Sequence, residues 1–111
     1  MNQNNVRPRR WAKTNYRFLL FNNGEYSIIW GKFDGVPAMG VRWNGDEDRV
    51  GYPRQGRHPL WYVEPDIIAI GILKHLLTIQ STNNIQTDEK NIRFALKEIN
   101  KKLESRKQFG S

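Results

Sequence analysis

The segment Tyr16–Gly45, "YRFLLFNNGEYSIIWGKFDGVPAMGVRWNG", decides the fold of this chain. Its apolar runs are separated by three Asx-Gly pairs: Asn23-Gly24, Asp34-Gly35 and Asn44-Gly45. An Asx-Gly pair supplies the positive φ angles that a tight type I′ hairpin turn requires. The segment therefore predicts an antiparallel β-meander of three strands, and the sequence after it offers short candidates for a fourth.

The Asp34-Gly35 turn fixes the register of the second hairpin. If these two residues form the turn, Phe33 lies opposite Val36, and every second residue along each strand shares one face of the sheet. We expect this core face to hold three cross-strand pairs: Tyr26–Trp43, Ile28–Val41 and Trp30–Met39.

The first hairpin should add to the same core face. A two-residue turn at Asn23-Gly24 places Phe21 beside Tyr26. The second face of the sheet then stays apolar, although a sheet with helices on one side is normally polar on the other. Either more of the chain covers this face, or it contacts a partner or a second copy. Its candidate interface residues are Tyr16, Phe18, Ile29 and Phe33.

Two helices are expected after the meander, at about residues 66–80 and 88–107. The first is apolar around its whole circumference, which is typical of a helix buried on most sides, and Gly71 should permit close contact with the sheet. The second begins after Thr87, a suitable N-cap, and carries one apolar stripe. The fold class is α+β: a three- to four-stranded antiparallel β-meander followed by two C-terminal α-helices.

The length of 111 residues indicates one domain, because two separate cores would each bury too little surface. We expect a basic flexible arm at 1–14, a single α+β domain at 15–107 and a frayed tail at 108–111. Within the domain, the meander occupies 15–52 and a loop occupies 53–60.

The chain has no cysteine, and its first residues lack the apolar run of a signal peptide, so the expected localisation is cytoplasmic. The apolar segment 67–79 is interrupted by Lys74 and His75 and is too short to cross a bilayer, so no membrane partner is expected.

The net charge of +7 is concentrated at the N-terminus. Residues 1–17 contain five basic and no acidic side chains, whereas residues 18–63 contain five of each. A basic arm beside a balanced domain attracts polyanions by counterion release, and nucleic acid is the commonest such partner. The alternative is that the arm only keeps the protein soluble. The candidate contacts in the arm are Arg7, Arg9, Arg10 and Lys13.

The segment Gly51–Tyr62, "GYPRQGRHPLWY", is the second candidate for partner binding. Guanidinium groups suit phosphate, and aromatic rings can stack on unpaired bases. The alternative is that Arg54 and Arg57 form ion pairs with the acidic stretch Asp46–Asp48. The candidate contacts of this region are Arg42, Tyr52, Arg54, Arg57 and His58.

The sequence offers little support for catalysis. His58 and His75 are the only histidines. His58 has no serine or acid nearby at nucleophile–base spacing, and His75 lies on the expected apolar helix, where a structural role is the ordinary interpretation. Three adjacent acids at residues 46–48 lack the spacing of a calcium loop, and glycine-rich phosphate loops are missing. We therefore expect no catalytic residues, cofactor or metal site, with an activity centred on His58 as the minor alternative.

Two functional hypotheses remain. The first is a small basic, non-enzymatic module that binds nucleic acid through its arm and its Arg/aromatic loop. The second is a protein-interaction module that uses the apolar second sheet face, either as a homodimer or as a small inhibitor or accessory protein of bacterial or mobile-element origin.

Overall fold

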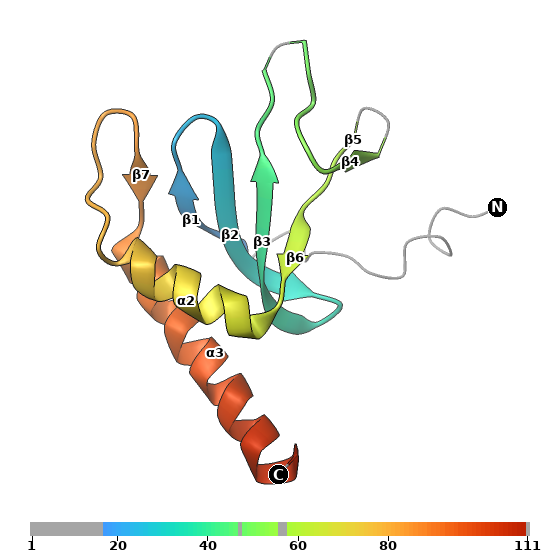
Figure 1. Cartoon of the computed structure of the whole chain (residues 1–111), viewed down its shortest axis with the longest axis vertical. Coiled ribbons are helices and arrows are strands. Elements are labelled where there is room, and N and C mark those ends of the chain that lie inside the picture. Colours follow the sequence, from blue (N-terminus) through green and yellow to red (C-terminus); the bar gives the residue numbers. More distant parts are fainter. Residues whose placement is uncertain (1–16, 47, 56–57, 111) are drawn as a thin grey trace, which may run out of the picture.

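The structure is a computed structural model that describes residues 17–46, 48–55 and 58–110. Five strands form one antiparallel sheet in the order β6-β3-β2-β1-β7 (Figure 1). The strands are β1 (Arg17–Asn22), β2 (Tyr26–Phe33), β3 (Val36–Trp43), β6 (Tyr62–Glu64) and β7 (Gln86–Thr87). A separate two-stranded hairpin lies in the expected loop and consists of β4 (Arg54–Gln55) and β5 (His58–Pro59).

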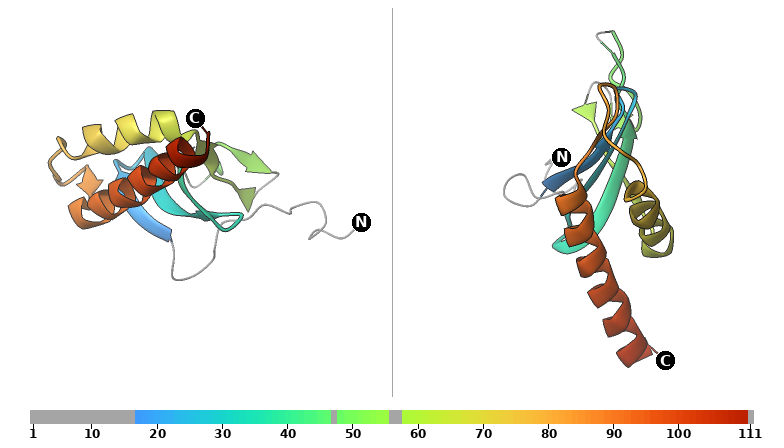
Figure 2. Two further views of the ribbon diagram at one scale, coloured as in Figure 1. Left: turned by 90° about the horizontal axis from the view of Figure 1, so that it is seen from below. Right: turned by 90° about the vertical axis from the view of Figure 1, so that its left-hand side faces the viewer.

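Two helices, α2 (Asp66–Leu76) and α3 (Glu89–Gly110), pack on the same side of the sheet (Figure 2). The predicted α+β class, with a meander followed by two C-terminal helices, is confirmed. The sequence did not predict β7, which pairs with the outer edge of β1 and extends the sheet beyond the meander.

The β2–β3 hairpin has the predicted register, with Phe33 opposite Val36 and Tyr26 opposite Trp43. Asp34 and Gly35 have φ angles of 55° and 79°, as a type I′ turn requires. Their intrinsic preference for positive φ angles is the reason why this register could be read directly from the sequence.

The predicted register of the β1–β2 hairpin is wrong. Phe21 pairs with Ile28, and the register shifts at a β-bulge between Leu19 and Phe21. The cause is the side chain of Asn23, whose Oδ1 accepts hydrogen bonds from the backbone N–H groups of Glu25 (3.0 Å) and Tyr26 (2.8 Å). This Asx turn uses more residues than the two-residue turn that we expected.

The bulge reverses the predicted orientation of part of β1, because an extra residue interrupts the alternation of side chains. Leu20 is fully buried in the helix-covered core. Phe18 packs against that core, and its ring lies 5.3 Å from the ring of Phe94 on α3. The prediction that Phe18 lies on the second face is therefore wrong.

The core lies between the sheet and the two helices. The sheet contributes Trp30 and Met39, both fully buried, and the helices contribute one apolar stripe each. The buried members of this cluster are Leu20, Ile28, Trp30, Met39, Val41, Ala69, Leu73, Leu76, Ile92, Ala95 and Ile99.

Helix α2 is not buried on most sides. Its inner stripe packs on the core, but Ile67 is 78% exposed and Ile68 is 49% exposed. Gly71 also faces outward, and a Cβ atom added there would meet no other atom within 4 Å. The predicted contact of Gly71 with the sheet is therefore wrong. The helix ends at Leu76, four residues earlier than expected.

Helix α3 begins one residue later than its predicted cap implied. Thr87 belongs to β7, and Oδ1 of Asp88 accepts a hydrogen bond of 2.9 Å from the backbone N–H of Asn91. The Asn91 side chain in turn donates to the carbonyl oxygen of Leu19 at 3.1 Å, which ties the start of α3 to β1. The helix continues to Gly110, into the segment where we expected a frayed tail.

Across residues 17–46, 48–55 and 58–110, the structure contains no helix with the length and apolar character needed to cross a membrane.

Candidate functional site: an exposed aromatic cluster beside an arginine groove

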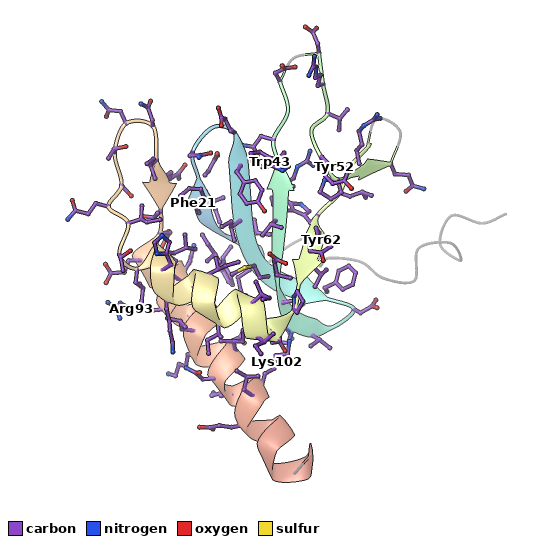
Figure 3. The ribbon with its side chains drawn as sticks, viewed as in Figure 1. Phe21, Trp43, Tyr52, Tyr62, Arg93 and Lys102 are labelled. Carbon is purple, nitrogen blue, oxygen red and sulfur yellow. The ribbon has the colours of Figure 1, made fainter. Side chains whose placement is uncertain are left out.

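Four aromatic residues form a cluster at the outer end of β3, where α2 does not cover the sheet (Figure 3). We call Tyr26, Trp43, Tyr52 and Tyr62 the aromatic cluster. Trp43, Tyr52 and Tyr62 are 54%, 69% and 55% exposed. Such large aromatic side chains are normally buried, so their exposure in one place marks a candidate binding surface.

Strand pairing brings the cluster together. Tyr26 lies opposite Trp43, with ring centroids 4.7 Å apart and an interplanar angle of 69°. Tyr62 is placed beside them by the pairing of β6 with β3. Tyr52 joins by an isolated bridge in which the backbone N–H groups of Trp43 and Tyr52 donate to each other's carbonyl oxygens at 2.6 Å and 3.0 Å.

The aromatic cluster borders two hollows that share Trp43 and Tyr52. The first, which we call the aromatic pocket, has a volume of about 270 Å³ and is lined by Tyr26, Val41, Arg42, Trp43, Tyr52, Pro53 and Tyr62. The second, which we call the arginine groove, has a volume of about 610 Å³ and is lined by Trp43, Gly45, Asp48, Arg49, Val50, Gly51, Tyr52 and Arg54.

The loop between Trp43 and Tyr52 is shaped by its own backbone contacts. Gly45 and Gly51 have φ angles of 79° and 91°, which favour glycine. Oδ1 of Asp46 accepts hydrogen bonds of 2.9 Å from the backbone N–H groups of Asp48 and Arg49. One oxygen of the Asp46 carboxylate thus closes a local turn, which is an ordinary structural use of an acidic residue in a loop.

Arg42 holds this loop from inside. Its guanidinium donates to the carbonyl oxygens of Val50, of Leu60 (3.4 Å) and of Trp43 (3.2 Å), so it joins both ends of the segment between β3 and β6. It also lies 5.9 Å from the centre of the Trp61 ring.

Arg42 is only 6% exposed, and burial lowers the pKa of its guanidinium. A group held in this way is not available to a phosphate in solution. Its contacts in the structure position the loop, so the expectation that it contacts a partner stays a prediction that needs a direct test.

The charges near the aromatic cluster are unequally distributed. The pKa of the Tyr26 phenol is raised, mainly by burial and further by the negative charge of Glu64. Glu64 lies on β6 at the helix side of the cluster, opposite Met39. Arg49 and Arg54 are exposed and line the groove on the outer side. The site therefore has an acidic inner end and an outer groove whose described lining residues include two arginines and one aspartate.

Only some of the other predicted contact residues line the candidate site. Tyr52 and Arg54 line the candidate site. The backbone of His58 lies in β5 opposite Gln55, whereas its side chain is outside the described part. The remaining predicted contacts and one predicted interface residue lie outside the described residues: Arg7, Arg9, Arg10, Lys13, Tyr16 and Arg57.

The centre of the second sheet face is buried. Ile29 is 6% exposed, and Phe33 is half-buried. By the pairing of β3 with β6, Val63 lies beside Gly40 on this face. Ile29 is therefore not accessible as an interface residue in this structure.

The sequence did not indicate Tyr26 and Trp43 as site residues, whereas Tyr62 ends the candidate segment Gly51–Tyr62, whose aromatic rings are candidates for base stacking. The predicted pairing of Tyr26 with Trp43 is correct, and Tyr26 packs against the core as expected. Trp43 is instead 54% exposed, because alternation gives the face of a residue and not the extent to which a helix covers it. The available signal was the position of this pair at the open end of the hairpin, directly before Asn44-Gly45.

Among the described residues, no group of three or more histidine, aspartate or glutamate side chains is arranged to hold a metal ion. Comparison of the chain with protein-family models, with curated proteins and with solved structures found no match.

Proposed function

We propose that this protein is a non-enzymatic module that binds single-stranded nucleic acid through the aromatic cluster. The observation that carries the proposal is the joint exposure of Trp43, Tyr52 and Tyr62 on one surface next to two arginines. Unpaired bases stack on exposed aromatic rings, and arginines contact the backbone that connects them. A duplex hides its bases inside the stack and cannot use such a surface.

The charge of the chain supports the same proposal. Residues 1–17 contain five basic and no acidic side chains, and a basic segment of this kind adds sequence-independent attraction to phosphate. In this proposal, the N-terminal segment contributes affinity, whereas the aromatic cluster contributes the preference for unpaired bases.

The test is a titration of the full-length protein into fluorescently labelled dodecamers, followed by fluorescence anisotropy at several salt concentrations. We expect oligothymidine to bind more tightly than a duplex of the same length. The double variant Tyr52→Ala, Tyr62→Ala should weaken binding to the single strand about tenfold or more, because each stacked base contributes roughly 1–3 kcal/mol.

A matched control is Val36→Ala, which removes an exposed apolar side chain at the start of β3, at the opposite end of this strand from Trp43. It should leave the affinity unchanged. A full-length variant in which Arg7, Arg9, Arg10 and Lys13 are replaced by glutamine should weaken binding to single and double strands alike. The proposal is wrong if the wild-type protein binds no oligonucleotide at low salt.

The outer face of α2 supports a second candidate, self-association. Ile67 and Ile68 are exposed around the open position of Gly71, where another helix could approach closely. An apolar helix face of this kind can pack against itself about a two-fold axis. An antiparallel pair of α2 helices would bury Ile67 and Ile68 of both copies, which favours a second copy of this chain as the occupant.

Light scattering over a range of protein concentrations tests this candidate. We expect the mass to rise towards that of a dimer with concentration, and Ile67→Lys should abolish the rise. A constant monomer mass at all concentrations, with no effect of Ile67→Lys, would exclude α2 as a self-association surface.

A further inference from the structure

The aromatic pocket and the arginine groove are separated by a shared wall. This wall consists of Trp43 and Tyr52, which line both hollows. The backbone bridge between these two residues holds the wall in place, and the Tyr26 ring packs against the Trp43 ring from the pocket side. A ligand that extends past this wall would contact aromatic carbon on one side and arginine on the other.

The two hollows differ in their chemistry. Apart from the buried Arg42, the described residues that line the aromatic pocket are uncharged, and the charge of Glu64 acts on Tyr26 at its inner end. Among the described residues that line it, the arginine groove contains Arg49 and Arg54 with one acid, Asp48. An anionic group is therefore favoured in the groove and disfavoured near Glu64, whereas a flat neutral group is favoured in the pocket.

We infer that one nucleotide of the bound strand occupies both hollows, with its base in the aromatic pocket and its adjoining phosphate in the arginine groove at Arg49 and Arg54. This inference rests on the proposed binding of single-stranded nucleic acid and adds the unit of recognition and its orientation. The base contributes stacking and the phosphate contributes a salt-dependent contact, so the two contributions should be separable.

The experiment uses the full-length protein and three octamers of equal charge: oligothymidine, oligothymidine with one central abasic site, and a wholly abasic strand. Affinity is measured by anisotropy at several salt concentrations. Oligothymidine should bind tightest and the wholly abasic strand at least tenfold more weakly, since it retains its phosphates and has no base for the pocket.

Two sets of variants separate the two hollows. The variant Tyr62→Ala should weaken oligothymidine binding about fivefold or more and leave the salt dependence unchanged, because Tyr62 lines only the aromatic pocket. The double variant Arg49→Gln, Arg54→Gln should reduce the slope of log affinity against log salt by about 1 and retain the preference for oligothymidine over the abasic strand.

Two controls test whether these changes in affinity and salt dependence are specific to the two hollows. The double variant Lys97→Gln, Lys101→Gln removes the same charge from exposed positions on α3 and should leave the slope unchanged. Circular dichroism melting of each variant confirms that it is folded, and Tyr62→Phe, which keeps the stacking surface, should restore the affinity lost in Tyr62→Ala.

The outcomes distinguish the inference from the function on which it rests. If all three octamers bind equally and the Tyr62 and arginine variants have no effect, the protein binds nucleic acid elsewhere and the inference is wrong. If no octamer binds at low salt, the proposed function also fails. If a proline decamer binds instead and Tyr62→Ala abolishes that binding, the aromatic pocket is a peptide site and the inference is overturned.

Discussion

The indole Nε1 of Trp30 donates a hydrogen bond of 2.8 Å to Oε1 of Glu98, and this bond joins the central strand β2 to α3. Trp30 is fully buried. Burial also raises the pKa of the Glu98 carboxyl, and the positive charges of Lys101 and Lys102 only partly oppose this effect. The carboxylate therefore serves as an acceptor at a position where its ionised form is disfavoured.

The first prediction concerns the pH dependence of stability. An acid whose pKa is raised by folding is protonated more readily in the folded state, so its contribution to stability is complete below its unfolded pKa and is lost as pH rises through the folded pKa. In Glu98→Gln, the amide oxygen can still accept the Trp30 hydrogen bond, and no charge forms. We expect the free energy of unfolding of this variant, relative to wild type, to be higher at pH 7 than at pH 4.

Urea denaturation at a series of pH values measures this difference. Glu104→Gln is the control, because Glu104 is exposed on the same helix and its replacement should give a difference that hardly changes with pH. A difference for Glu98→Gln that is constant from pH 4 to pH 7 would contradict the prediction.

The second prediction concerns the attachment of α3 to the rest of the fold. Nζ of Lys102 donates to Oδ1 of Asp66 at 3.0 Å and to the carbonyl oxygen of Pro37 at 2.6 Å. The side chains of Lys102 and Asp66 are only 17% and 8% exposed. Lys102→Met removes the cation from a largely buried pair, so we expect a loss of about 3 kcal/mol in the free energy of unfolding.

Lys101→Met supplies the matched comparison, because Lys101 is the exposed neighbour on the same helix and should change the stability by less than about 0.5 kcal/mol. Both values come from chemical denaturation at neutral pH. Similar losses in the two variants would mean that the Lys102–Asp66 pair is not an important attachment of α3.

The third prediction contrasts two glycines. Gly71 lies on the outer face of α2, with open space around the position of a Cβ atom, so Gly71→Ala should raise the free energy of unfolding by about 0.5–1 kcal/mol. Gly51 has a φ angle of 91°, and a Cβ atom there would clash with the carbonyl oxygen of Trp43 and lie 2.7 Å from the Arg42 guanidinium. Gly51→Ala should therefore destabilise the protein by about 2 kcal/mol.

Thermal and urea unfolding measure both glycine variants under the same conditions. Changes of the same sign in the two variants would be inconsistent with the structure. Light scattering on Gly71→Ala also tests the proposed self-association. The added methyl group would weaken a close contact between the α2 helices of two copies, even though it stabilises the helix of each copy.

The sequence predicted those parts of the fold that depend on local backbone chemistry. Asp34 and Gly35 both favour positive φ angles, so the β2–β3 register followed from two adjacent residues. The register of β1 could not be derived in this way. It depends on the hydrogen bonds of the Asn23 side chain and on a bulge at Leu20 that no periodicity reveals. The strand β7 was missed because it consists of only two residues in a polar segment.

The candidate site was harder to predict than the fold, because exposure depends on which parts of the sheet the helices cover. Trp43 lies on the same face as the buried Trp30 and Met39, and the extent to which the helices cover the sheet separates the exposed ring from the buried side chains. The burial of Arg42 was not predicted for the related reason that a charged residue in a sequence gives no sign of being buried against backbone carbonyls.

The last prediction tests whether Arg42 positions the loop or contacts a ligand. Its guanidinium donates to three backbone carbonyl oxygens across the segment from Trp43 to Leu60, and hydrogen bonds from a charged donor contribute about 1.5–3 kcal/mol each. Arg42→Gln should therefore lower the free energy of unfolding by about 2 kcal/mol or more and increase amide hydrogen exchange in the loop. Because the group is buried, the variant should weaken oligonucleotide binding without changing its salt dependence, whereas Arg49→Gln should change the salt dependence and leave the stability nearly unaltered. A reduced salt slope in Arg42→Gln at unchanged stability would show instead that Arg42 reaches the phosphate.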